Sequence, residues 1–90
     1  MSVKIEIPSF LRSFTHDTEI IEVKGNTVGE CLNQLAKQFP DIRNMLFSKD
    51  GSLFDHVIVS VNSENAYPEQ LAKAVKDGDT IHIIFIIGGG

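Results

Sequence analysis

One short helix pattern stands between two groups of strand-like segments. Thr27 and Glu30 have the spacing of a capping box, in which the threonine caps the helix and the glutamate reaches back. Pro40 ends the pattern. Between these signals, apolar residues recur at helical spacing: Val28, Cys31, Leu32, Leu35, Ala36 and Phe39. The sequence therefore predicts one main helix over residues 27–39, with a single apolar face to bury.

Four segments have the pattern of β-strands. Segment 3–7 alternates polar and apolar residues, and segment 18–24 is rich in β-branched residues. Segments 56–62 and 80–87 are largely apolar and are bounded by turn residues. We expect the first two to pair as an antiparallel hairpin with a long loop. The first and last strands should lie side by side in the middle of the sheet, because both are rich in Ile and Val.

The connecting segments are expected to hold little regular structure. Residues 8–17 should form a loop, 41–47 a short turn of helix, and 63–75 an irregular stretch with one helical turn near 70–73. Three apolar side chains of the first loop should tuck under the sheet edge: Phe10, Leu11 and Phe14. The order is strand, strand, helix, strand, irregular segment, strand, which predicts an α+β roll with one sheet over one helix.

Composition limits the class of protein. Ninety residues with 42% apolar and 22% charged side chains correspond to one ordinary globular domain. A net charge of −4 argues against binding nucleic acid through a basic field. A single cysteine allows no internal disulfide and suits a reducing cytoplasm, and no signal-peptide pattern is visible. The last apolar run is too short to cross a bilayer, so we expect a cytoplasmic protein, monomeric when alone.

The side chains offer little chemistry of their own. The three histidines are scattered without metal-ligand spacing: His16, His56 and His82. Cys31 falls on the apolar helix face, where a core residue is favoured over a reactive thiol. Asp77 and Asp79 flank a glycine and are interpreted as turn residues. The chain also lacks a phosphate-binding loop and a nucleophile–base pair, so we expect no enzyme activity, no bound cofactor and no metal.

Three glycines, Gly88, Gly89 and Gly90, follow the last apolar run. Glycine costs entropy to order, but it suits a tail whose backbone enters a narrow channel and presents its α-carboxylate to another protein. The alternative is a fragment end or a flexible remnant. The sequence thus predicts a domain at 1–87 and a flexible tail at 88–90, with Gly90 and Gly89 as the reactive end and Gly88 as a partner-binding residue.

Strand alternation divides the apolar residues between two faces. One set should face the helix: Val3, Ile5, Ile7, Val57, Val59, Val61, Ile81, Ile83 and Phe85. A second set should then point outward among charged residues: Ile20, Ile58, Ile84 and Ile86. Apolar side chains grouped on an open sheet face indicate a docking patch, although a covering loop, or isolated exposure without meaning, would explain them too.

Several segments together resemble a known family. They are residues 7–12, 25–30, 59–62 and 77–81, followed by the diglycine end. In order and spacing they resemble the ubiquitin-like β-grasp sulfur carriers of the MoaD/ThiS type, over nearly the whole chain. That family includes the small subunit of molybdopterin synthase, the thiamine-pathway carrier and a carrier for cysteine synthesis. The opening Ile-Pro-x-x-Leu-Arg is most similar to the cysteine-pathway type.

The resemblance implies a function. An E1-like enzyme would adenylate the Gly90 carboxylate with ATP, and a sulfur donor would replace AMP to leave a C-terminal thiocarboxylate. A sulfur-accepting synthase would be the further partner, and the nucleotide site and any metal would belong to these partners. Two other readings stay open: a ubiquitin-like modifier joined to lysines through Gly90, and a plain β-grasp interaction module.

Overall fold

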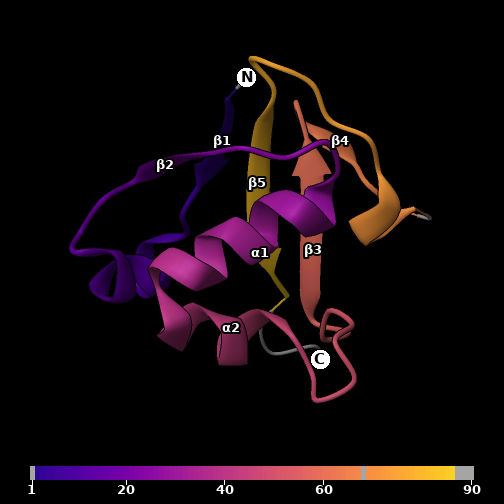
Figure 1. The fold of residues 1–90 in the computed structure, drawn as a ribbon. Coiled ribbons are helices and arrows are strands. Elements are labelled where there is room, and N and C mark those ends of the chain that lie inside the picture. The colour runs from indigo at the N-terminus through magenta and orange to yellow at the C-terminus, as the bar shows by residue number, and fades with distance from the viewer. Residues whose placement is uncertain (1, 68, 87–90) are drawn as a thin grey trace.

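A mixed sheet backed by helices forms the protein. Within residues 2–67 and 69–86, which the computed structural model describes, five strands make one sheet in the order β2-β1-β5-β3-β4. The strands are β1 (Val3–Glu6), β2 (Ile20–Val23), β3 (Val57–Val61), β4 (Glu64–Asn65) and β5 (Thr80–Phe85). The helices are α1 (Val28–Gln38) and α2 (Pro40–Leu46), with 3-10 segments η1 (Ser9–Thr15) and η2 (Gln70–Ala72). Figure 1 shows α1 and α2 on one face of the sheet.

The strand pairing agrees with the predicted arrangement. β1 pairs antiparallel with β2 and parallel with β5, so the first and last strands are neighbours at the centre. β3 pairs antiparallel with both β5 and β4. The predicted hairpin, central pair and ubiquitin-like β-grasp fold class are therefore confirmed.

The capping box forms at the start of α1. The Glu30 backbone N–H donates to Thr27 Oγ1 at 3.1 Å, and the Glu30 carboxylate accepts the Asn26 N–H at 2.8 Å. The carboxylate thus bonds the backbone of the residue before the N-cap rather than that of the N-cap itself. A side chain at Gly25 would place its Cβ 3.0 Å from the backbone nitrogen and from the sulfur of Cys31, so the strand can approach the helix this closely only with glycine there.

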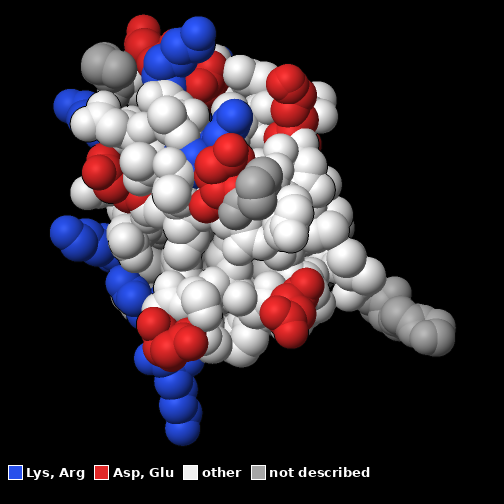
Figure 2. All heavy atoms as spheres, turned by 90° about the vertical axis from the view of Figure 1, so that its right-hand side faces the viewer, with Lys and Arg blue, Asp and Glu red and all other residues white. Residues whose placement is uncertain are grey.

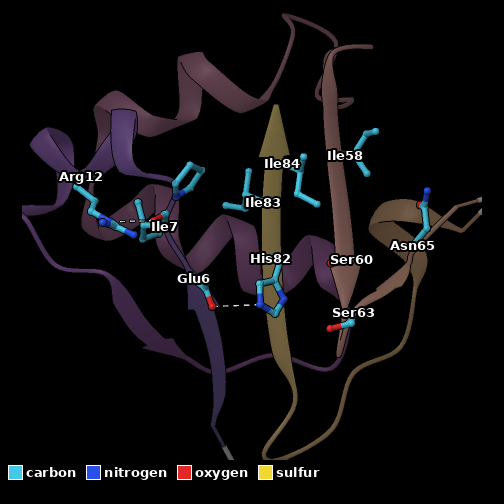
Figure 3. A pocket seen from close by; sticks show the side chains of 11 residues that line it. Glu6, Ile7, Arg12, Ile58, Ser60, Ser63, Asn65, His82, Ile83 and Ile84 are labelled. Atoms are coloured by element: carbon cyan, nitrogen blue, oxygen red, sulfur yellow. Dashed lines mark hydrogen bonds and ion pairs between the residues drawn. The ribbon is translucent and has the colours of Figure 1, made fainter. Parts of the chain in front are cut away.

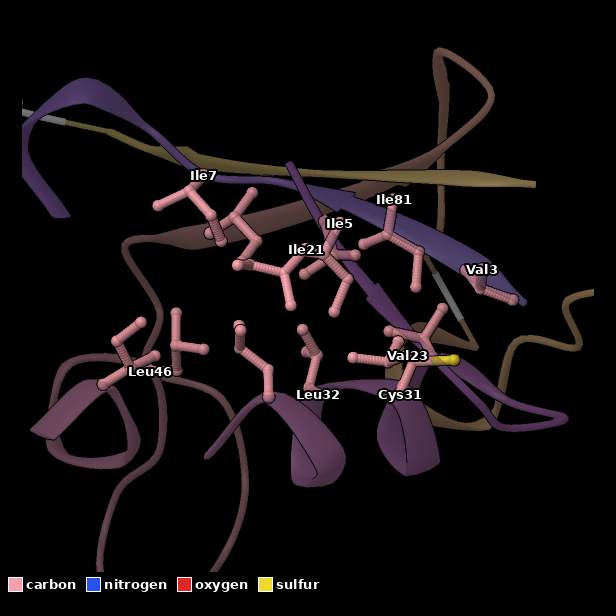
Figure 4. Close-up of a cluster of buried hydrophobic side chains, with 14 of the residues drawn as sticks. Val3, Ile5, Ile7, Ile21, Val23, Cys31, Leu32, Leu46 and Ile81 are labelled. Carbon is pink, nitrogen blue, oxygen red and sulfur yellow. The ribbon is translucent and has the colours of Figure 1, made fainter. Parts of the chain in front are cut away.

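The core lies between the sheet and the helices (Figure 4). The apolar face of α1 is buried as predicted, apart from Phe39, which is half-buried. The predicted inner face of the sheet is also buried, except that Phe85 at the end of β5 is half-buried. Fully burying a Val, Leu or Ile side chain stabilises a fold by about 1.5–3 kcal/mol. The buried faces of α1 and of the sheet therefore supply most of the stabilisation.

Three connecting segments are more regular than predicted. Residues 8–17 hold η1 rather than a loop, and the buried Thr15 hydroxyl contacts the carbonyls of Arg12 and Thr18 at its end. The prediction for Phe10 was wrong, because its side chain remains 48% exposed, whereas Leu11 is fully buried. α2 has seven residues rather than a single turn, and Pro40 begins it. β4 was not predicted, since a two-residue strand carries no periodic signal.

The chain ends are only partly described. β2 and β5 are shorter than the predicted strands at 18–24 and 80–87. The predicted tail at 88–90, and with it the boundary after residue 87, lies outside the described residues.

A polar network joins the turn after β3 to the start of β5. The Asn62 side chain donates to Asp79 Oδ1 at 2.9 Å and accepts the Thr80 N–H at 2.9 Å. The Lys76 N–H donates to the other Asp79 oxygen at 2.9 Å. The hydrogen bond from Asn62, followed by that from Lys76, lowers the pKa of Asp79 below its ordinary value of 3.8. The ionised carboxylate is thus the form that stabilises this corner of the sheet.

We predict that Asp79→Asn lowers the free energy of unfolding at pH 7 by about 1–2 kcal/mol, because hydrogen bonds to a charged acceptor are lost. The folded-state pKa is depressed, so the contribution of the carboxylate is present above the unfolded value of 3.8 and is lost as pH falls through the folded value. Urea unfolding should show that the difference in unfolding free energy between the wild type and Asp79→Asn is smaller at pH 3 than at pH 7. Asp55→Asn, an exposed aspartate outside this network, is the control, and an equal gap at both pH values would contradict the assignment.

Candidate functional site

The open face of the sheet carries the outward isoleucines. Ile20, Ile84 and Ile86 are 49%, 48% and 51% exposed. Ile58 is half-buried. In Figure 2 this face is seen edge-on at the right, where most of the surface between the acidic side chains is uncharged. The structure thus places these residues on one face, while their role in docking stays a prediction.

The strand register divides this set into two parts. Ile58 and Ile84 are direct cross-strand partners on β3 and β5. Ile20 instead pairs with Glu6, whose neighbour on the other side is His82. A polar pair therefore separates Ile20 from the other isoleucines, so we define the docking patch as Ile58, Ile84 and Ile86, with Ile20 at its far margin.

Glu6 and His82 form the polar centre of the open face. His82 Nε2 lies 3.1 Å from Glu6 Oε2, and both side chains are partly exposed. Nδ1 of His82 is buried and has no hydrogen-bond partner among the described residues, so a neutral imidazole would carry its proton on Nε2 and donate it to Glu6. Sequence reasoning missed this pair, because alternation shows that both residues face outward but not that the parallel register sets them opposite each other.

A shallow hollow of about 470 Å³ covers the middle of this face (Figure 3). Its lining residues come mainly from β1, β3 and β5 and the segments next to them: Glu6, Ile7, Pro8, Arg12, Ile58, Ser60, Ser63, Asn65, His82, Ile83 and Ile84. Arg12 at one end is held in place, because its Nε donates to the Ile7 carbonyl at 3.1 Å and its guanidinium pairs with Glu19 at 3.3 Å. Apolar walls with a few fixed polar groups suit the side chains of a protein partner.

The chain leaves the sheet next to the docking patch. β5 ends at Phe85, and the Ile86 N–H donates to the His56 carbonyl at 2.8 Å. Gly88, Gly89 and Gly90 lie outside the described residues. A partner bound to Ile84 and Ile86 would therefore lie close to the point in the sequence where the glycine segment begins.

Cys31 and Asp77, which the sequence analysis considered for chemistry, have structural roles. Cys31 is fully buried on α1, and burial, with a smaller effect of Glu30, raises the pKa of its thiol to about 11. Such a thiol stays protonated at neutral pH and is a poor nucleophile. Asp77 accepts the Ser2 N–H at 2.7 Å.

Neither a metal site nor a spanning helix is found in the part of the chain that the structure describes. No three His, Cys, Asp or Glu side chains there are grouped so that they could hold a metal ion. None of its helices has the length and apolar character needed to cross a bilayer.

Known proteins resemble this chain in both sequence and structure. The sulfur carrier protein CysO of Mycobacterium tuberculosis is 31% identical over 93 residues, which cover 100% of both chains. Small archaeal modifier protein 1 of Haloferax volcanii is 34% identical over 71 residues, or 78% of each chain. A chain in the crystal structure of the Amycolatopsis orientalis BexX/CysO complex is 32% identical, with a TM-score of 0.89 and coverage of 98% of this chain and 99% of that one.

The family model described as the ThiS family matches residues 5–90, which is nearly the whole chain. The relatives named above are small sulfur-carrier and modifier proteins rather than catalysts. The fold, the full-length similarity and the family match agree, and the chain belongs to the ThiS family.

Proposed function

We propose that this protein is a sulfur carrier and that the Gly90 carboxylate is its reactive group. One observation carries the proposal: similarity to a sulfur carrier protein runs over 100% of both chains. The family match also extends through the glycine segment to residue 90. The sulfur would be used in the biosynthesis of a cofactor or an amino acid, namely molybdopterin, thiamine or cysteine. We place the protein in the cytoplasm, where its single cysteine stays reduced.

The proposed chemistry has two steps, both carried out on partner enzymes. A carboxylate is a poor electrophile, so one oxygen of Gly90 first attacks the α-phosphorus of ATP and pyrophosphate leaves. Hydrosulfide supplied by a donor then attacks the carbonyl carbon of the acyl-adenylate, AMP departs as the leaving group, and the carrier ends in a thiocarboxylate with the sulfur at an unchanged oxidation level. We assign ATP and its metal to an E1-like enzyme, because the sequence has no phosphate-binding loop and no three His, Cys, Asp or Glu side chains of the described residues are grouped to hold a metal ion.

The carrier would contribute recognition and delivery. A glycine tail alone offers few contacts, whereas presenting a carboxylate to a distant nucleotide requires the whole domain to be held in place. The docking patch lies where the chain leaves β5, so one surface of the partner can bind the patch and the chain that follows β5 together. A CysO relative with a TM-score of 0.89 occurs in a complex with BexX, which supports a protein partner for this chain as well.

A second function is favoured by a separate observation. The chain is 34% identical over 71 residues to small archaeal modifier protein 1. An activated Gly90 could equally be attacked by a lysine amine, which would form an isopeptide bond and release AMP. The two functions share the first step and differ in the nucleophile that follows.

We predict that protein purified from its native cell carries sulfur. Replacing one carboxylate oxygen by sulfur raises the intact mass by about 16 Da, and mass spectrometry of the whole chain resolves this change. Larger adducts linked to lysine would support the modifier function instead. A chain that shows only the unmodified mass, also after isolation with its partner enzyme, would argue against both.

Changes in the glycine segment should impair activation of the carboxylate. We predict that Gly89→Val and deletion of Gly90 both sharply reduce ATP–pyrophosphate exchange by the cognate adenylating enzyme. The valine side chain obstructs a narrow channel, and the deletion withdraws the carboxylate by about 3.5 Å. Because Gly88 leaves the deleted chain with two glycines, the valine variant is the more stringent test. Undiminished exchange in both variants would show that the tail is not the substrate.

Ile84→Asp should weaken partner binding while the domain stays folded. Burying a large apolar side chain is worth about 1.5–3 kcal/mol, so we predict roughly a ten- to hundredfold rise in Kd. Ile84 is 48% exposed, and circular dichroism should therefore remain that of the wild type. Ile58→Asp should weaken binding as well, but its half-buried position makes some loss of stability expected. Normal binding by a folded Ile84→Asp variant would place the docking surface elsewhere.

A further inference from the structure

Four rings lie in a row where the chain leaves the sheet. Phe85 meets Phe10 edge to face, with ring centres 4.7 Å apart and an interplanar angle of 82°. Phe85 also lies near His56, with ring centres 5.7 Å apart and an interplanar angle of 44°. His56 in turn stacks on Phe54 at 5.3 Å and 15°. We call these residues the aromatic collar: Phe10, Phe54, His56 and Phe85.

The collar joins three separate parts of the fold at one point. Phe10 belongs to η1, Phe85 is the last residue of β5, and Phe54 and His56 precede β3. His56 holds the departing chain twice, because its ring lies beside Phe85 and its carbonyl accepts the Ile86 N–H at 2.8 Å. Phe85 itself pairs with Val57 across the sheet. The last described residues are thereby held by contacts from both neighbouring segments.

Phe10 is not explained by the hydrophobic core. Its side chain is 48% exposed, while Leu11 beside it is fully buried. The ring is only half removed from water, and its edge-to-face contact with Phe85 adds a directional interaction beyond the area that it buries. That contact is to the residue that immediately precedes the exit of the chain.

We propose that the aromatic collar fixes the direction in which the chain leaves β5, and that Phe10 and His56 are positioning residues for activation of Gly90. The inference rests on the proposed carrier function. Residues 87–90 can span at most about 14 Å, so the position of Ile86 limits where the Gly90 carboxylate can lie, and a shift of Ile86 shifts that range by the same amount. A misplacement of about 1 Å can already cost on the order of a hundredfold in rate.

The first test needs no partner and examines the collar alone. In Phe10→Ala we expect the Ile86 amide, measured by NMR, to exchange with solvent roughly two- to tenfold faster, which corresponds to the loss of one aromatic pair. His56→Ala should have the same effect, because it removes the second ring that lies against Phe85. Phe10→Tyr keeps the ring and should restore the wild-type rate. Ser13→Ala, an exposed change on the same 3-10 segment, is the matched control and should have no effect.

The second test separates positioning from binding. With the cognate adenylating enzyme and Phe10→Ala as substrate, we expect kcat of ATP–pyrophosphate exchange to fall about ten- to a hundredfold. KM should stay within about twofold, and Phe10→Tyr should recover kcat. Circular dichroism and the exchange of amides in α1 should match the wild type, which confirms that the domain is folded.

The outcomes distinguish the collar from the carrier function. Unchanged Ile86 exchange in both Phe10→Ala and His56→Ala overturns the collar, whatever the kinetics. A raised KM with unchanged kcat also overturns it, because Phe10 would then be a contact for the partner. If the wild-type chain is not adenylated at all, the proposed function fails, while the exchange measurement still decides whether the collar holds the chain.

Discussion

The parallel pairing of β1 with β5 is the contact on which the other features of the domain depend. It brings residues 76 positions apart into direct register, with Ile5 opposite Ile81 and Glu6 opposite His82. The inward members of these strands form the centre of the core against α1. The outward members form the polar centre of the open face. One pairing thereby organises the interior and the exposed surface together.

The two faces of the sheet have different physical tasks. The face toward α1 and α2 supplies stability, since its Val, Ile and Leu side chains are almost entirely removed from water. On the open face the isoleucines remain partly exposed to water. This exposure does not stabilise the domain by itself. Under the proposed carrier function, this division would suit a protein that partner proteins recognise and act upon.

The end of β5 is where delivery and recognition meet. β5 lies between β1 and β3, but its pairing with β1 covers only residues 80–82, so residues 83–85, where the chain departs, are paired with β3 alone. Docking through Ile84 and direction through Phe85 would act on adjacent residues with opposite orientations. Alternation along one strand thus allows contact with the partner on one face and support from the domain on the other.

The sequence by itself determined the secondary structure of the core and the division between its faces. The capping box at Thr27 and Glu30 and the alternation in β1 and β5 are local signals, because helix and strand periodicities follow from backbone geometry. The Glu6–His82 pair, the split in the isoleucine set and the contact of Phe10 with Phe85 were decided by the tertiary structure. Each depends on the register or packing of segments distant in sequence, and no local pattern encodes how such segments align. The 3-10 segment η1 belongs to this group as well, since its sequence has no helical period and the buried Leu11 and Thr15 hold it in place.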